Sequence, residues 1–247
     1  MKRILATFTL CALLVGAAHA QKPNTLTKKE KKAGWRLLFD GKTTKGWHTY
    51  GRDTVGSKWT VKNGAFVFDP SRTGGRIASG GDITTNEEFT NFEFSVDWKV
   101  EKGSNSGLIF NIQEKRGVPG YGQTYSSGLE MQVLDNIDAS DNKKENHLAG
   151  QLYDIYGSAA MSKPKPVGEW NNARIIQKNG HVTLIFNGIT TFEGQLGSPE
   201  FLALVAKSKF ANEKSFPHFA KVAGGKIAFQ EHPGSSSWRN VKIRELK

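Results

Sequence analysis

The chain has 247 residues, a net charge of +11 and a single cysteine, Cys11. Hydrophobic residues make up 37% of it, a proportion that suits a globular domain with an apolar core. One cysteine excludes an internal disulfide. The positive charge does not indicate a nucleic-acid partner, because the basic residues are gathered near the start or dispersed, without a stripe of basic and aromatic residues.

The first twenty residues have the features of a secretory signal peptide. Lys2 and Arg3 precede an apolar run that ends at Ala18-His19-Ala20, a small-x-small cleavage pattern. The run is too short to cross a bilayer as a helix, so we expect no membrane span. We predict cleavage after Ala20, and therefore a periplasmic or secreted protein whose mature chain has no cysteine.

The mature chain should begin with a short extension and continue as one domain. Residues 21–33 are polar and rich in lysine, which predicts a flexible basic leader. The folded domain is expected to extend over 34–247.

Strand-like patterns follow one another through this domain. The clearest runs over 91–100, where apolar and polar residues alternate with the period of two that a strand requires. Asn-Gly pairs, which favour tight hairpins, separate several of the strands. One helix is expected from Pro199 to Lys207, with Ser198 as its N-cap. The expected strands are 36–39, 57–61, 65–68, 91–100, 107–113, 128–134, 172–177, 182–186, 190–193, 226–232 and 238–246.

Many short alternating strands, regular turns and a single helix predict an all-β domain. The pattern favours a jelly-roll sandwich of two antiparallel sheets with one short helix. Such sandwiches bind ligands on the open face of one sheet, although this is an analogy between folds.

One strand combines a core face with a polar face. Leu129, Met131 and Val133 alternate with Glu130 and Gln132, so one side can enter the core while the other carries a carboxylate and an amide. A solvated outer face is the alternative interpretation. We expect this strand to line a polar cleft.

A second strand far along the chain repeats the arrangement. Gln230 and His232 share one face, with apolar residues on the other, and would meet Glu130 if the two strands lie side by side in one sheet. A carboxylate and an imidazole in a partly desolvated cleft can share acid and base roles near neutral pH. A surface position is the alternative for a histidine at a strand end.

Other polar residues are weaker candidates. Asn105 and Ser106 stand between glycines just before a strand, where a tight turn is an equally good interpretation. Arg239 could offer a planar fork of donors to a sugar, or be a surface charge. The loop with Asp135 and Asp141 could hold Ca²⁺ through oxygen ligands, but it lacks the glycine and glutamate of an EF-hand.

Several common catalytic motifs are absent from the sequence. It contains no G-x-S-x-G nucleophile elbow, phosphate-binding P-loop, H-E-x-x-H zinc motif or dinucleotide fingerprint.

The chain from Gly34 to Leu246 resembles a bacterial family, the 3-keto-disaccharide hydrolases, also described as 3-keto-glucoside 1,2-lyase/3-keto-2-hydroxyglucal hydratase domains. The family fold is a concanavalin-like jelly-roll sandwich, which agrees with the strand pattern. The matching motifs are, in chain order, Leu38-Phe39-Asp40-Gly41 with Gly46-Trp47, Phe92-Glu93-Phe94 through Trp98, Asn105-Ser106-Gly107-Leu108, Gly128 to Asn136, Leu152-Tyr153-Asp154, Gly168-Glu169-Trp170-Asn171, Asn187-Gly188, Lys207-Ser208-Lys209-Phe210, and Gly225 to His232 with Arg239 to Ile243.

The resemblance implies an enzyme that cleaves 3-keto-glycosides, with an oxidised sugar or glycoside as its partner. It implies Glu130 as base or metal ligand and His232 as acid or base. The expected cofactor is none, or a divalent cation such as calcium, manganese or magnesium. The residues expected to bind the sugar are Gln132, Asp135, Gln230, Arg239, Asn105, Ser106, Tyr153 and Lys207.

A non-catalytic carbohydrate-binding module is the alternative function. The same sandwich serves lectins, and six tryptophans could stack on sugars. Such a module would bind unoxidised glycans and form no product.

Overall fold

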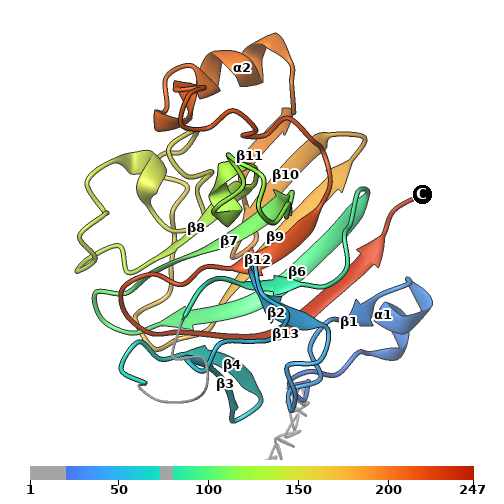
Figure 1. Ribbon diagram of the computed structural model, residues 1–247. Coiled ribbons are helices and arrows are strands. Elements are labelled where there is room, and N and C mark those ends of the chain that lie inside the picture. Colours follow the sequence, from blue (N-terminus) through green and yellow to red (C-terminus); the bar gives the residue numbers. More distant parts are fainter. Residues whose placement is uncertain (1–20, 73–79) are drawn as a thin grey trace, which may run out of the picture.

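The computed structural model describes residues 21–72 and 80–247, so the predicted signal peptide lies outside the described residues. Two antiparallel β-sheets pack face to face and make up most of the described chain (Figure 1). The predicted sandwich of two antiparallel sheets is confirmed. Within the described part, no helix has both the length and the apolar character that a membrane crossing needs.

The larger sheet has eight strands in the order β11-β10-β9-β6-β13-β4-β3, with β1 paired to β13. Its two longest strands, β6 and β13, are adjacent and lie inside the sheet. The bounds are β1 Arg36–Leu37, β3 Trp59–Lys62, β4 Ala65–Phe68, β6 Phe92–Val100, β9 Asn171–Lys178, β10 His181–Phe186, β11 Ile189–Gln195 and β13 Ser236–Glu245.

The smaller sheet has five strands in the order β2-β5-β12-β7-β8. Residues far apart in the sequence meet here, because β12 lies against β7, which in turn pairs with β8. The bounds are β2 Trp47–Thr49, β5 Ile83–Thr85, β7 Asn105–Ile112, β8 Leu129–Leu134 and β12 Lys226–Phe229.

Aromatic and aliphatic side chains fill the space between the sheets. The apolar residues of β6 are almost completely buried, as the alternating pattern predicts. Phe229 of the smaller sheet stacks between Trp47 and Trp238, with ring centroids 5.0 and 4.1 Å apart. Because Trp238 comes from the larger sheet, this stack ties the two layers together.

Turns and caps form where the sequence predicts them. Asn63 and Gly64 have φ angles of 52° and 74°, as the tight hairpin between β3 and β4 requires. Helix α2, Pro199–Val205, begins after Ser198, whose hydroxyl accepts a hydrogen bond from the Phe201 N–H. Three short 3₁₀ segments are also present, η1 Thr124–Ser126, η2 Glu145–His147 and η3 Lys209–Ala211.

Within the segment predicted as a basic leader, the structure has a short helix, α1, Lys28–Lys32. Asn24 and Asn240 exchange hydrogen bonds between side chain and backbone, and Glu30 pairs with Lys242. The lysine content predicts the polarity of this segment, but these contacts join it to β13.

Candidate active site

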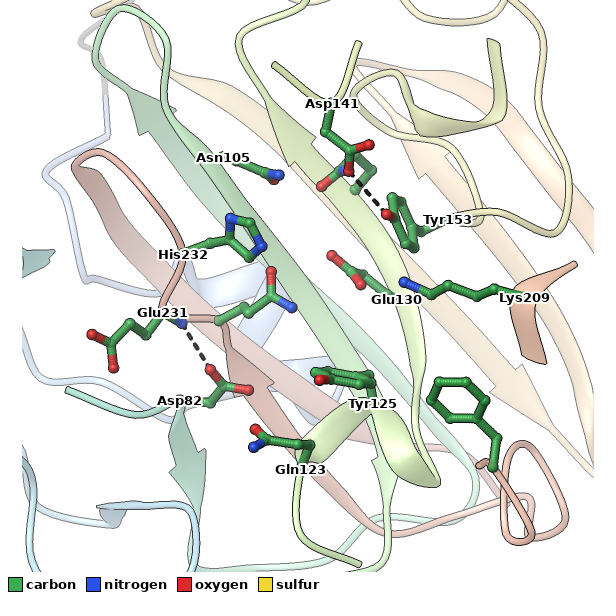
Figure 2. A pocket seen from close by; sticks show the side chains of 13 residues that line it. Asp82, Asn105, Gln123, Tyr125, Glu130, Asp141, Tyr153, Lys209, Glu231 and His232 are labelled. Carbon is green, nitrogen blue, oxygen red and sulfur yellow. Dashed lines mark hydrogen bonds between the residues drawn. The ribbon is translucent and has the colours of Figure 1, made fainter. Parts of the chain in front are cut away.

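A polar cavity of about 370 Å³ opens on the outer face of the smaller sheet (Figure 2). Strands β7, β8 and the end of β12 form its floor. Its walls come from the loops that follow these strands, from the loop before β5 and from the segment between α2 and β12. Its lining residues are Asp82, Asn105, Gln123, Tyr125, Glu130, Gln132, Asp141, Tyr153, Lys209, Phe216, Gln230, Glu231 and His232.

Strand alternation places the polar face of β8 in this cavity. Leu129, Met131 and Val133 are buried in the core, so Glu130 and Gln132 project to the other side. The prediction that this strand lines a polar cleft is confirmed. β12 is not its direct neighbour, however, because β7 lies between the two strands.

Gly107, in the intervening strand, provides room for the Glu130 carboxylate. It pairs with Gln132, while the next residue on its face, Ile109, pairs with Glu130. A Cβ atom at Gly107 would collide with the Glu130 carboxylate. The absence of a side chain therefore lets Glu130 lie across β7 towards the β12 side of the cavity.

The variant Gly107→Ala should lower activity without unfolding the protein. The methyl group must displace the flexible end of Glu130, and misplacing a reacting group by about 1 Å can cost about 10²-fold in rate. The measurement is kcat together with the thermal unfolding temperature. Gly122→Ala is the matched control, because a Cβ there meets no atom within 4 Å. Equal kcat for the two variants would contradict this role of Gly107.

Burial dominates the electrostatics of Glu130. The residue is 7% exposed, and desolvation disfavours its charged form. The positive charge of Lys209 opposes this effect, whereas Asp82 and Asp141 reinforce it, and together they raise the pKa of Glu130 to about 8. Glu130 is therefore mainly protonated at neutral pH and can donate a proton.

The pKa of His232 is shifted in the opposite direction, downwards. Its ring stands at the rim of the cavity, where water still reaches it, and in Figure 2 it faces Glu130 across the floor. Desolvation by the cavity walls, helped by the charge of Lys209 and opposed by Asp141, holds the pKa of His232 below its usual value of 6.5. The imidazole is therefore mainly neutral at neutral pH and can accept a proton.

A second carboxyl group lines the wall beyond β12. Burial raises the pKa of Asp82 to about 6, although Thr124 and the backbone N–H of Glu231 donate hydrogen bonds to it. These contacts join Asp82, in the loop before β5, to η1 and to the segment after β12.

A chain of hydrogen bonds supports the opposite wall. The Tyr153 hydroxyl donates to Asp141 Oδ2 at 2.9 Å, and Asp141 Oδ1 lies 2.8 Å from His147 Nδ1. The other ring nitrogen of His147 lies 2.8 Å from Asp154, which accepts a hydrogen bond from the Lys209 N–H at 2.7 Å. Asp141, Tyr153 and Lys209 are thereby held in one network.

Among the described residues, Lys209 is the only lysine or arginine that lines the cavity. Its ammonium group lies over three aromatic rings, 4.4 Å from the centroid of Tyr153, 5.1 Å from that of Phe210 and 5.8 Å from that of Tyr125. In Figure 2 the ammonium group points towards Glu130.

The structure brings six of the ten predicted site residues together. The proposed acid–base pair and four of the proposed sugar-binding residues line the same cavity. The chemical roles assigned to them stay predictions. The six are Glu130, His232, Gln132, Gln230, Asn105 and Tyr153.

The other four predicted residues lie outside the cavity. Asp135 accepts hydrogen bonds from the backbone N–H groups of Gly103 and Ile137, so it stabilises a turn. Ser106 faces the core side of β7 and donates to the Gln230 carbonyl at 2.7 Å.

Arg239 and Lys207 lie outside the cavity for different reasons. Arg239 is in β13 of the larger sheet, where its guanidinium lies 4.0 Å from the centroid of the Trp170 ring. Lys207 follows the end of α2 and is exposed, and the lysine that reaches the cavity is Lys209, two residues later.

Several residues of the cavity have no signal in the sequence. Asp82, Gln123, Tyr125 and Phe216 come from loops without a recognisable motif. Asp141 is the exception, since it belongs to the loop considered for Ca²⁺. Its carboxylate is bonded to Tyr153 and His147 instead.

The described residues contain no cluster of three or more His, Cys, Asp or Glu side chains that could hold a metal ion. We therefore derive no step through a metal, and the divalent cation stays a prediction. It can be tested by measuring activity with and without a chelator.

The fold and the cavity define a two-sheet β-sandwich protein with a polar ligand site on one sheet. Residues 34–244 match the family described as the 3-keto-alpha-glucoside-1,2-lyase-like domain, and the chain belongs to this family. A 3-keto-disaccharide hydrolase of Bacteroides thetaiotaomicron is 36% identical over 229 residues, which cover 86% of this chain and 79% of the relative.

Two crystal structures from Parabacteroides distasonis, each of a protein named as a candidate glycosyl hydrolase, share the fold. They have TM-scores of 0.79 and 0.62 at 30% and 25% sequence identity. The matches cover 92% and 86% of this chain, and 100% and 99% of the two solved chains.

Proposed function

We propose that this protein is an exported enzyme that cleaves 3-keto-glycosides by removing the proton at C2, eliminating the C1 substituent and adding water. The observation that supports this most is the pair Glu130 and His232. The two side chains line one polar cavity, and their surroundings shift their pKa values in opposite directions.

The chemistry requires a base and an acid on the two sides of a sugar. A ketone at C3 makes the C2–H acidic, because the electron pair left at C2 delocalises into the carbonyl group. Loss of the C1 oxygen substituent then forms a C1=C2 double bond conjugated with the ketone. The leaving oxygen needs a proton to depart as an alcohol.

The protonation states of Glu130 and His232 favour the opposite assignment to one with Glu130 as base and His232 as acid. The neutral imidazole of His232 takes the C2 proton, and the protonated carboxyl of Glu130 gives its proton to the leaving oxygen. Glu130 acting as base with a charged His232 as acid would require the less populated form of each group.

Addition of water repeats these steps in reverse. After elimination, Glu130 is a carboxylate and His232 an imidazolium. A water molecule takes the place of the alcohol, gives a proton to Glu130 and adds to C1, while His232 returns a proton to C2. The net reaction is hydrolysis, and both groups regain their starting forms.

The rest of the cavity suits a sugar rather than an apolar ligand. Amide groups of Gln132, Gln230 and Asn105 stand along its floor. The carbonyl oxygen Oδ1 of Asn105 is buried and has no hydrogen-bond partner among the described residues. A buried acceptor of this kind can be satisfied by a sugar hydroxyl.

The test compares two substrates that differ only at C3. The purified protein is incubated with an aryl glucoside and with its 3-keto derivative, and release of the phenol is measured. We expect release from the 3-keto form only. Equal release from both forms, or binding of glycans without any product, would contradict the proposed function.

A further inference from the structure

We propose that Lys209 is a catalytic residue that binds the C3 oxygen of the substrate and carries the negative charge that develops there as the C2 proton leaves. The proposal rests on the proposed function and adds to it a group for the enolate. Removing the C2 proton leaves a negative charge on the C3 oxygen, and such a charge needs a cation or several hydrogen-bond donors beside it.

The surroundings of Lys209 leave its ammonium group directed at the cavity. Its described contacts are aromatic rings, which attract a cation but accept none of its N–H groups in the way an oxygen does. Among the described residues its ammonium group forms no ion pair. A ligand oxygen within the cavity can therefore supply the missing acceptor.

A hydrogen bond to Asp154 fixes the position of the Lys209 backbone. Its N–H donates to Asp154 at 2.7 Å, and Asp154 also contacts His147 and Lys144 at 2.8 and 3.0 Å. Burial alone would raise the pKa of Asp154, but these hydrogen bonds hold it below its usual value. Asp154 is thus a stable anionic anchor for the turn that carries Lys209.

The other titratable groups of the cavity are less suited than Lys209 to stabilise a negative charge on the C3 oxygen. Among the described residues, the other titratable side chains that line it are four carboxyl groups, two tyrosines and His232. His232 is mainly neutral before it takes the proton, and Glu130 is mainly protonated. The charge of Lys209 is therefore not cancelled by Glu130 when the substrate arrives.

The variant Lys209→Met keeps an unbranched side chain that is one atom shorter and removes the charge. We expect kcat on a 3-keto aryl glucoside to fall by about 10²- to 10³-fold, the usual loss for one donor to a developing oxyanion. Exchange of the C2 hydrogen of a 3-keto glucoside with solvent deuterium should fall by the same factor. Lys209→Arg, which keeps the charge, should retain part of both activities.

The matched control is Lys207→Met. Lys207 is exposed, lies two residues away and does not reach the cavity, so this variant should have the wild-type rate. Thermal unfolding of all three variants shows whether the fold persists. A variant in which turnover falls while C2 exchange stays at the wild-type rate would overturn the proposal.

The pH profile provides a readout that a purely structural role would not change. The titratable groups that face Glu130 are Lys209 from η3, Asp82 before β5, Asp141 and Tyr153 after β8, and His232 after β12. The charge of Lys209 holds down the pKa of Glu130. In Lys209→Met the loss of activity at alkaline pH should therefore begin at a higher pH than in the wild type.

The outcomes separate this proposal from the proposed function. A wild-type protein that does not act on 3-keto-glycosides would overturn both. An active wild type with an equally active Lys209→Met variant would overturn the role of Lys209 alone.

Discussion

The variant Glu130→Gln should lose almost all activity and yet be more stable than the wild type. Gln has the shape of a protonated Glu but cannot donate the proton that the leaving oxygen needs. General acid catalysis contributes about 10²- to 10⁴-fold, so kcat for a glycoside with an alcohol leaving group should fall by about 10³-fold. The measurement is release of the alcohol under substrate saturation.

The size of this loss should depend on the leaving group. A strongly acidic phenol departs without a proton, so a 3-keto nitrophenyl glucoside should lose much less rate in Glu130→Gln than a 3-keto alkyl glucoside. Removing a base would slow both substrates alike. An equal loss for the two would contradict the role of Glu130 as acid and return it to the role of base.

The gain in stability follows from the raised pKa of Glu130. The folded pKa of about 8 is higher than the ordinary value of 4.5, so the folded state holds this proton where the unfolded chain releases it. The wild type therefore loses stability as the pH rises from about 4.5 to about 8. The variant has no such loss.

Chemical denaturation at pH 5 and pH 8 measures this difference in the free energy of unfolding. The advantage of Glu130→Gln over the wild type should grow by about 1 kcal/mol for each pH unit in this interval. The control is Glu101→Gln, because Glu101 is exposed and lies outside the cavity. A constant difference between pH 5 and pH 8 would show that Glu130 is ionised in the folded protein.

The variant His232→Ala should lose activity whatever the leaving group. Without the imidazole, no group stands ready to take the C2 proton, and kcat should fall by about 10³-fold for both phenyl and alkyl 3-keto-glucosides. Added imidazole should restore part of the rate if it enters the space that the side chain leaves.

The pH profile of the wild type should have two limbs that these variants remove separately. Activity requires a neutral His232 and a protonated Glu130, so it should rise through a pKa below 6.5 and fall through one of about 8. The acid limb should vanish in His232→Ala and the alkaline limb in Glu130→Gln. A variant that keeps the limb assigned to the missing residue would show that another group titrates there.

Strand periodicity was sufficient to predict the polar face of β8. The alternation of core residues with Glu130 and Gln132 has one consistent solution once the apolar side is buried. The same periodicity, applied to β7, would place Ser106 on the core side, where the structure has it. The candidate site was therefore most predictable where it is built on strands.

The sequence could not show which sheet a strand joins, or where loops end. Arg239 alternates correctly with the buried Trp238, but β13 belongs to the larger sheet, so its outer face is away from the cavity. Lys207 would be the last residue of a longer helix. Because α2 ends at Val205 and a 3₁₀ turn follows, Lys209 reaches the cavity instead.

The loop residues depend on contacts between distant parts of the chain. Asp82 is fixed by Thr124 and by the backbone of Glu231, which are remote from it in sequence. Asp141 is held by Tyr153 and His147 across a long loop. No local pattern specifies these positions, and they become visible only when the sheets have brought the loops together.

Deuterium incorporation at C2 tests the removal of the C2 proton most directly. The protein cleaves a 3-keto glucoside in heavy water, and the sugar product is analysed at early times against a sample without enzyme. Water reaches the His232 imidazolium at the rim of the cavity, so this group exchanges its proton with the solvent before it returns one to C2. One deuterium at C2, above the level of spontaneous exchange, is therefore the expected result. A product that keeps its original C2 hydrogen would show that the glycosidic bond is broken by direct hydrolysis, and elimination through His232 and Glu130 would be wrong.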